Sequence, residues 1–386
     1  MEHNDGIATS SFRGASGDAE HVICIEAPAG LGLAQQIDAV ERRYETARCA
    51  LKLAPDSAIF RRLFVSDVMN QAPALRQSRL FAALEEGPVA VSIVQQPPLP
   101  EAKLALFAYH LESAAPLAKR RLAAKHLLVE KSGLAHLWST RLCAGADGGA
   151  DSAASQTRAV FDELIATLAR QGGTLRDHCV RTWIYLKDVD VFYHGMVESR
   201  STLFREQGLT GDSHYIASTG IEGACAHRYD LVAMDAYSIL GLAPRQVSYL
   251  NDFELLCATK DYNVTFERGT RIGYADRAHH FISGTASIDN RGRVLYPGDV
   301  LRQLERALDN VEGLLRSGGA GLADMMHLTV YLRDPTDFAG VQRALAERLP
   351  GLPALIVQGA VCRPEWLVEV EGVAAAAQDA PALPRF

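Results

Sequence analysis

Residues 172–188 read Gly-Gly-Thr-Leu-Arg-Asp-His-Cys-Val-Arg-Thr-Trp-Ile-Tyr-Leu-Lys-Asp, and residues 318–334 read Gly-Gly-Ala-Gly-Leu-Ala-Asp-Met-Met-His-Leu-Thr-Val-Tyr-Leu-Arg-Asp. The two segments align without a gap at an offset of 146 residues, the distance from Gly172 to Gly318. Each runs from a pair of glycines to an apolar segment that ends in Tyr-Leu, a basic residue and an aspartate. An internal repeat of this kind indicates a chain built from repeated structural units.

An amphipathic helix is predicted ahead of each pair of glycines, because apolar residues recur there at three- and four-residue spacing. These residues are Val160, Leu164, Ile165 and Leu168 in the first copy and Leu304, Leu308, Val311 and Leu315 in the second. A glycine suits the left-handed residue that often ends a helix, and a strand is predicted to follow it. A second helix, near 193–207 and 338–348, and two closing strands complete each copy.

The repeat predicts an α+β fold of two fused lobes, each a mixed β-sheet with two helices packed on one face. The chain of 386 residues has a suitable length for two domains. We expect an N-terminal lobe at residues 21–245 and a C-terminal lobe at 250–375. Flexible tails are expected at 1–20 and 376–386. Three extra strands are expected ahead of the repeat within the first lobe, at residues 22–25, 60–65 and 90–95.

Composition excludes several classes of protein. The net charge of −7, from 39 basic and 46 acidic residues, gives no basic excess for a nucleic-acid partner. No apolar run approaches the roughly 20 residues that span a bilayer, and residues 1–20 do not resemble a secretory signal. The seven cysteines are scattered without a CxxC pair, which argues against a disulfide framework. We therefore expect a cytoplasmic protein with no membrane partner.

Motifs for metals and cofactors are also missing. The sequence has no Walker A, HExxH or GxSxG motif, and its histidines do not pair at metal-ligand spacing. Gly30 and Gly32 begin a glycine-rich stretch, but Gln35 stands where a dinucleotide fingerprint needs its third glycine. We expect neither a metal nor a cofactor.

Several motifs carry a resemblance to known families. The second lobe is similar to the small RidA/YjgF domain in its strand at 280–288, its Gly318-Gly319 helix end, its strand at 329–334 and its closing strand at 368–372. The whole arrangement resembles the chorismatases, which split chorismate into pyruvate and a ring product. That resemblance covers residues 130–375 and rests on Ala217-Ser-Thr-Gly-Ile221, on Cys362-Arg-Pro and on Glu369. It implies a site between the lobes, chorismate as substrate, and a monomer or homotrimer.

Two acidic residues alternate with valines on the closing strand. Glu369 and Glu371 therefore point from one face of it, where a solvated sheet face is the alternative to a functional pair. The first lobe has Ala233 and Asp235 at the matching positions, so Glu369 is not a copied surface feature. Repulsion between two neighbouring carboxylates raises one pKa, which suits a general acid near neutral pH. The resemblance gives Glu369 the role of protonating the enolpyruvyl methylene of chorismate.

Cys362 precedes Glu369 by seven residues, at the expected end of the preceding strand. A free cysteine is most often a small buried apolar residue. The resemblance instead implies that a cysteine here is typical of the branch that forms 3-hydroxybenzoate, by steering the ring intermediate toward it. A 4-hydroxybenzoate or a dihydroxycyclohexadienoate product remains an alternative.

Further candidates would bind the substrate. Arg181 and Arg200 could hold its carboxylates, since arginine offers a bidentate fork, although surface cations are the alternative for both. Tyr193 is the aromatic residue that shares a helix face with Arg200. Tyr215, Ser218, Thr219 and Gly220 are expected to form the substrate wall. Gly284 could allow a close backbone approach, or it could be an ordinary strand glycine.

Two other functions remain open. RidA-type proteins deaminate enamines and imines and hold the substrate with an arginine after a Pro-Ala pair. Here Leu355 follows Pro353-Ala354, and Thr219 stands at the matching position of the first lobe, which disfavours that activity. A non-catalytic ligand-binding protein is the third interpretation, because a fold does not determine a function.

Overall fold

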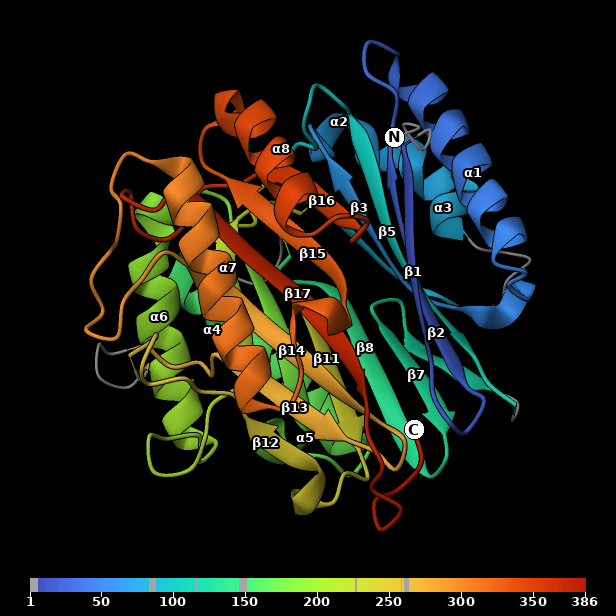
Figure 1. Cartoon of the computed structure of the whole chain (residues 1–386), viewed down its shortest axis with the longest axis vertical. Helices are drawn as coiled ribbons and strands as arrows, with labels where there is room; N and C mark the ends of the chain where they lie inside the picture. The colour runs from blue at the N-terminus through green and yellow to red at the C-terminus, as the bar shows by residue number, and fades with distance from the viewer. Residues whose placement is uncertain are drawn as a thin grey trace.

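A computed structural model describes residues 6–82, 88–114, 117–145, 151–225, 228–257, 259 and 264–386. Three β-sheets account for the strands of this part of the chain, and the longer helices cover their outer faces (Figure 1). We call the three sheets with their helices lobe 1 (residues 7–112), lobe 2 (118–240) and lobe 3 (247–377). Short 3-10 turns lie at Pro55–Ser57, Pro244–Gln246, Leu322–Asp324 and Pro335–Asp337.

Lobe 1 is a five-stranded sheet with the order β1-β2-β5-β3-β4. Its strands are β1 (Ile7–Arg13), β2 (Ala19–Glu26), β3 (Ala58–Val65), β4 (Ala90–Gln95) and β5 (Leu104–Glu112), and its helices are α1 (Leu33–Ala50), α2 (Val68–Gln77) and α3 (Arg79–Ala82). The three extra strands expected here are present as β2, β3 and β4. They do not merely extend another lobe, however, because β1 and β5 complete a separate sheet with them.

Lobes 2 and 3 are the two copies of the sequence repeat. Lobe 2 contains β6 (Ala118–Ala123), β7 (His126–Lys131), β8 (Leu134–Cys143), α4 (Ala153–Arg170), α5 (Leu175–His178), β9 (Cys179–Leu186), α6 (Val189–Glu206), β10 (Ala217–Glu222) and β11 (Val232–Leu240). Lobe 3 contains β12 (Val247–Tyr249), β13 (Gly269–Gly273), β14 (Arg277–Ala286), α7 (Val300–Ser317), β15 (Met325–Leu332), α8 (Phe338–Arg348), β16 (Ala354–Gln358) and β17 (Val368–Ala377). The helix, glycine and strand order predicted from the repeat is present in both.

The same five-strand pattern occurs in all three lobes. Lobe 2 has the order β7-β8-β11-β9-β10 with β6 added at one edge, and lobe 3 has β13-β14-β17-β15-β16 with β12 added. In each lobe the third and fourth strands are parallel and enclose a helix, while the fifth is antiparallel to the third. Where two lobes were expected, the described chain therefore contains three of one pattern.

A helix-ending residue explains why lobe 1 is hard to recognise in the sequence. Gly172 and Gly319 follow α4 and α7 with φ values of 76° and 80°, the left-handed conformation that glycine adopts easily. At the same place after α1, Lys52 adopts a φ of 58°. The glycine signal is absent from lobe 1, although its backbone turns in the same way.

The two expected tails belong in part to the folded structure. Residues 7–13 form β1, which pairs with β2, whereas residues 1–5 lie outside the described residues. Strand β17 continues to Ala377, and Phe386 is only 2% exposed. The expectation of flexible ends was wrong for these parts, because apolar side chains such as Phe386 are buried against other lobes.

The lobes form a closed ring. The fourth strand of each lobe contacts the second strand of the next, so that β4 lies against β8, β10 against β14, and β16 against β2. One hydrophobic cluster contains buried residues from all three lobes, including Phe60, Trp183 and Tyr331. The inner faces of the sheets therefore share a central core (Figure 1).

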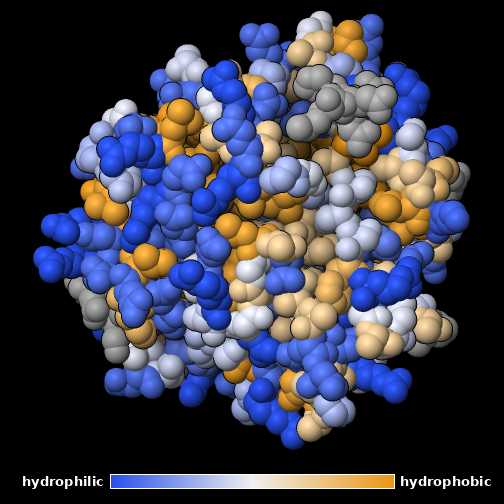
Figure 2. Space-filling view, viewed as in Figure 1, coloured by the Kyte–Doolittle hydropathy of each residue, from blue (hydrophilic) through white to orange (hydrophobic). Residues whose placement is uncertain are grey.

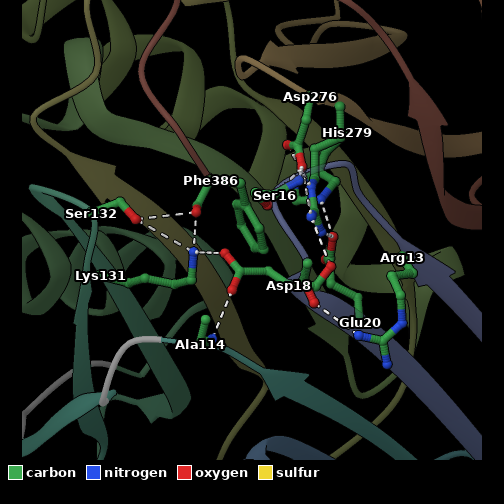
Figure 3. A network of polar contacts seen from close by, with 12 residues as sticks. Arg13, Ser16, Asp18, Glu20, Ala114, Lys131, Ser132, Asp276, His279 and Phe386 are labelled. Carbon is green, nitrogen blue, oxygen red and sulfur yellow. Dashed lines mark hydrogen bonds and ion pairs between the residues drawn. The ribbon is translucent and has the colours of Figure 1, made fainter.

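Buried ion pairs join the lobes at one end of this core (Figure 3). Lys131 of lobe 2 is paired with Asp18 of lobe 1 at 2.6 Å and also donates to the backbone oxygen of Phe386. Arg277 and His279 of lobe 3 contact Glu20 of lobe 1 at 2.7 and 2.8 Å. Because breaking a buried pair leaves an unpaired charge, these contacts hold the three lobes in register.

The outer surface is mixed in character. Figure 2 shows apolar residues near the middle of one face, with hydrophilic residues toward its left side. A groove of about 610 Å³ is lined by Leu345 and Leu349 of α8 together with Ala8 and Glu26 of lobe 1. Among the helices of the described chain, we find none with the length and apolar character needed to cross a membrane.

Candidate active site

A cavity of about 850 Å³ lies at the junction of lobes 2 and 3. It is formed where β10 packs against β14. Two hydrogen bonds fasten these strands: the Ser218 amide donates to Ser283 Oγ, and the Gly284 amide donates to Thr219 Oγ1, both at 2.9 Å. The expected wall residues Ser218, Thr219 and Gly220 all line the cavity.

Glu369 lines this cavity from the closing strand of lobe 3. It is 5% exposed, and we find no hydrogen-bond partner for its carboxyl group among the described residues. Burial raises the pKa of Glu369 to about 8, and the nearby charge of Glu371 adds to this effect. A carboxyl group with this pKa is protonated at neutral pH and can act as a general acid.

Glu371 lies on the same face of β17 but has a different environment. Its carboxylate accepts hydrogen bonds from Arg181 at 2.5 Å, Trp183 at 2.8 Å and Tyr331 at 2.9 Å, and also from Thr219. These donors stabilise the charged form, so the two acidic residues of one strand can hold different protonation states.

Gly284 provides the space that the Glu369 carboxyl group occupies. A Cβ atom at this position would lie 2.2 Å from Glu369 Oε1 and 3.1 Å from Thr219 Cγ2. Of the two interpretations of Gly284, close approach is the one that this geometry supports.

The acid is found at one of three equivalent positions. Glu369 pairs with Ala286 on β14 and with Tyr331 on β15. The equivalent residue of lobe 2 is Ala233, which pairs with Cys143 and Tyr185. The equivalent residue of lobe 1 is Ala105, which pairs with Glu26 and Phe64. Only the junction of lobes 2 and 3 therefore places a carboxyl group here.

Cys362 and Tyr193 line the same cavity as Glu369. Cys362 lies in the loop after β16, which ends at Gln358, and so it is not at a strand end as expected. Burial raises the pKa of the Cys362 thiol to about 12, with the charge of Glu369 acting in the same direction. Burial also raises the pKa of the Tyr193 hydroxyl. Both groups are therefore neutral at pH 7, and they can contact a substrate without reacting with it as anions.

Arg200 reaches the cavity from α6 and is 2% exposed. Its Nε donates to Thr265 Oγ1 at 3.1 Å, but its Nη2 has no hydrogen-bond partner in the described part of the chain. A buried guanidinium nitrogen without a partner is costly unless a ligand satisfies it. Arg200 is therefore well placed to bind an anion.

Two expected substrate contacts are placed elsewhere. Arg181 is 1% exposed, does not line the cavity, and directs its guanidinium to Glu371, Thr219 and the Thr182 carbonyl oxygen. Tyr215 also lies outside the cavity lining; its ring packs near Phe204, with centroids 6.3 Å apart. The alternation of residues along a strand shows which face of the sheet each side chain points from. It does not show which lobe packs against that face.

The structure adds three residues that the sequence analysis did not select. Arg268, Arg363 and Trp366 line the cavity. The Arg363 guanidinium lies 4.7 Å from the Trp366 ring, whose indole nitrogen donates to the Ser287 carbonyl oxygen. Arg363 belongs to the Cys-Arg-Pro motif, which could have indicated it, whereas Arg268 precedes a strand without any periodic signal.

No group of three or more His, Cys, Asp or Glu side chains suited to a metal ion occurs in the described ranges. The cavity cations are arginines, and the carboxyl group of Glu369 has Glu371 as its acidic neighbour. The arrangement can bind an anionic molecule and transfer a proton to it.

Comparison with known proteins connects this geometry to a family. The model of the family described as Endoribonuclease L-PSP matches residues 274–376. A RutC family protein of Pyrococcus abyssi is 31% identical over 96 residues, which are 24% of this chain and 76% of that protein. The chain belongs to the RutC family. Lobe 3 is its RutC-type lobe, and a RutC family protein of Pyrococcus horikoshii matches at 32% identity over the same proportions of both chains.

Chorismatases are also similar to part of this chain. A chorismatase of Streptomyces hygroscopicus is 39% identical over 120 residues, 28% of this chain and 35% of that enzyme. The chain thus aligns with about a third of the length of this relative. A chorismatase crystal structure has a TM-score of 0.63 at 18% identity, covering 95% of this chain and 99% of the other. The α+β fold with RidA-like lobes and the resemblance to chorismatases are therefore confirmed.

Proposed function

We propose that this RutC family protein cleaves chorismate to pyruvate and a ring product, without a cofactor. The observation that carries the proposal is the buried, unbonded carboxyl group of Glu369, with a pKa of about 8, in a cavity with three arginines. The 39% identity to a chorismatase over 120 residues supports the same reaction.

Arginine side chains would bind the two carboxylates of the substrate. Arg200 offers the Nη2 atom that has no partner in the described structure. Arg268 and Arg363 approach the same cavity from lobe 3. Arg181, expected to be an anchor, would act instead as the cation that keeps Glu371 ionised. We assign Arg181 a different role from the other three arginines because its guanidinium group does not line the cavity.

Glu369 would transfer its proton to the terminal methylene carbon of the enolpyruvyl ether. The methylene becomes a methyl group, and the ether carbon becomes an oxocarbenium ion. The bond between the ether oxygen and the ring then breaks with its electron pair going to the oxygen, so pyruvate leaves and the positive charge passes to the ring. The Glu369 carboxylate formed beside Glu371 is unfavourable, because two close negative charges repel each other. The acid therefore still holds its proton at neutral pH when the substrate binds, and it readily recovers one after the transfer.

The ring product that we propose is 3-hydroxybenzoate. Chorismate converts to pyruvate and a hydroxybenzoate without net uptake of water, whereas a dihydroxycyclohexadienoate requires one added water molecule. To give this isomer, the neighbouring hydroxyl oxygen must form a bond to the ring carbon that loses pyruvate and break its bond to its original carbon. The ring loses one proton in total as it aromatises, which balances the proton delivered by Glu369. Cys362 and the Tyr193 ring stand beside the acid and would exclude water from the ring intermediate.

The experiment is to incubate the purified protein with chorismate and to follow pyruvate while separating the ring products by chromatography. We expect equal amounts of pyruvate and 3-hydroxybenzoate. Formation of pyruvate with another ring product would retain the reaction and refute the product assignment. Absence of pyruvate would refute the proposed function.

A Cys362→Ala variant tests the role of the thiol in the same assay. We expect a larger fraction of the water-added product, because the smaller side chain leaves room for water beside the ring. Cys49→Ala is a matched control, since Cys49 is exposed on α1 in lobe 1. An unchanged product ratio at an unchanged rate would show that Cys362 only fills space.

A further inference from the structure

A second cavity, of about 740 Å³, lies inside the ring of lobes. Its wall contains eight aromatic residues contributed by all three sheets: Phe60, Phe64, Phe107 and Tyr109 of lobe 1, Trp138, Trp183 and Tyr237 of lobe 2, and Phe281 of lobe 3. Protein interiors otherwise contain few voids larger than a water molecule. About 70 Å³ of this cavity is free space, more than the roughly 10–15 Å³ that one water needs. This space is therefore large for a packing defect.

Several wall residues are incompletely covered although they point to the centre of the molecule. Phe107, Trp138, His327 and Val373 are only half-buried. Phe60 and Trp138 are stacked at a ring separation of 4.8 Å, and Tyr237 lies 4.4 Å from Trp138. The uncovered ring surfaces match an aromatic guest, because rings attract one another in edge-to-face or offset arrangements.

Two polar groups of the wall lack partners. Within the described chain, the Trp138 indole N–H makes no hydrogen bond, and neither does the His327 imidazole, whose Nδ1 is fully buried. Burial lowers the pKa of His327 to about 3, so the ring is neutral. A guest that carries a hydroxyl group could satisfy both an N–H donor and an imidazole acceptor.

The charged groups of the wall are already neutralised. Arg62 contacts Asp235 at 3.1 Å and Glu371 at 4.0 Å. Glu20 is bound by Arg277 and His279 within the network of Figure 3. An anionic guest would lose its hydration without finding an unpaired cation, which is strongly unfavourable. The wall therefore selects against carboxylates, unlike the cavity that contains Glu369.

We propose that the central cavity is a binding site for a neutral single-ring phenol. The aromatic wall would hold the ring of the guest, and Trp138 and His327 would bind its hydroxyl group. The site is separate from the Glu369 cavity, and its occupancy does not depend on the proposed reaction with chorismate.

The test measures binding directly. Phenol is the probe, toluene is the comparison without a hydroxyl group, and benzoate is the comparison with a charge. We expect saturable phenol binding in ligand-observed NMR together with a change in tryptophan fluorescence. Toluene should bind more weakly by a few-fold, about the contribution of one hydrogen bond. Benzoate should not compete with phenol for this site.

A substitution that fills the cavity tests whether phenol binds there. Val373→Phe should weaken phenol binding by at least about tenfold, because the added ring occupies the guest volume. Val191→Phe is the matched control, since Val191 is 63% exposed on α6, and it should bind phenol like the wild type. Trp138→Phe provides an independent variant that retains an aromatic ring and removes the N–H, so the preference for phenol over toluene should fall.

Any of three results would overturn the proposal. The first is the absence of saturable phenol binding to the wild-type protein. The second is phenol binding that survives both Val373→Phe and Trp138→Phe in folded protein, which would place the probe elsewhere. The third is competition of benzoate with phenol, which would assign the probe to the arginine-lined cavity. None of these results depends on whether the protein releases pyruvate from chorismate.

Discussion

Glu369 and Glu371 lie two residues apart on one face of β17, but only Glu371 accepts hydrogen bonds within the described structure. Four donors from lobes 2 and 3 surround the Glu371 carboxylate. Its charge then adds to burial in keeping Glu369 protonated. Lobe 2 thereby contributes to the protonation state of an acid that lobe 3 carries, and several measurable consequences follow from this relationship.

Replacement of the acid should remove the proton source while retaining its shape. We expect Glu369→Gln to lower turnover of chorismate by about 100-fold or more, the scale of a positioned general acid, with a smaller change in KM. Pyruvate release measures the effect. Glu347→Gln is the matched control, because Glu347 is exposed on α8. Near-wild-type turnover by the Glu369→Gln protein would exclude this residue as the acid.

The pKa of Glu369 predicts the pH dependence of activity. The acid is protonated below pH of about 8, so kcat/KM should fall as the pH rises through this value. Measurement of kcat/KM from pH 6 to about 10 shows at which pH the fall occurs. A flat profile across this range would contradict a protonated Glu369 as the active form.

The same shift predicts a pH dependence of stability. The folded-state pKa of about 8 exceeds the ordinary value of 4.5, so the folded protein holds the proton more tightly than the unfolded chain. This contribution to stability is full below pH 4.5, and it is lost as the pH rises to about 8. Glu369→Gln cannot titrate, so its Tm relative to wild type should be higher at pH 9 than at pH 5. Equal Tm differences at both pH values would argue against the shift.

Gly284→Ala should displace the acid without disturbing the lobes. The added methyl group would lie 2.2 Å from Glu369 Oε1, so the carboxyl group must rotate away from its position. We expect a large fall in kcat. Gly321→Ala is the control, because no atom lies within 4 Å of the place that its added methyl group would take, and its φ is −142°. Full activity of folded Gly284→Ala protein would show that the observed position of Glu369 is not required.

Arg181 and Arg200 should differ in the property that their replacement changes. Arg181→Met removes the nearer of the two cations that contact Glu371, and loss of one partner of a buried pair destabilises a protein by about 3–5 kcal/mol. Arg200→Met should instead raise the KM for chorismate by roughly 10–100-fold, the effect of losing a hydrogen bond to a charged group. Thermal unfolding and steady-state kinetics distinguish the two. A large KM effect of Arg181→Met at unchanged Tm would restore Arg181 as a substrate anchor.

The repeat made lobes 2 and 3 predictable, since their glycines, helices and strands recur in the sequence. Lobe 1 was not recognised as a further copy, because Lys52 adopts the left-handed conformation without the glycine that usually marks it. Residues other than glycine can adopt the left-handed conformation at a modest energetic cost. The end of such a helix therefore leaves no reliable signal in a single sequence.

The strand alternation correctly placed Glu369 and Glu371 on one face, because side chains alternate along any strand. It could not place Arg181, whose partner Glu371 belongs to another lobe. Arg268 was missed for a related reason: it precedes β13 in an irregular segment, where no periodicity applies. Contacts between lobes are set by tertiary packing, which local patterns do not encode.

The closed ring of lobes has a consequence for the way its junctions can change. In a ring assembled from identical chains, every substitution appears at all of the junctions simultaneously. Here the junctions β4–β8, β10–β14 and β16–β2 are encoded separately, because one chain supplies all three. Ala105 and Ala233 therefore occupy the positions equivalent to Glu369 in the other two lobes. The junction of lobes 2 and 3 keeps its acid regardless of these two residues. A tight-binding inhibitor directed at the acid should accordingly titrate with a stoichiometry of one per polypeptide.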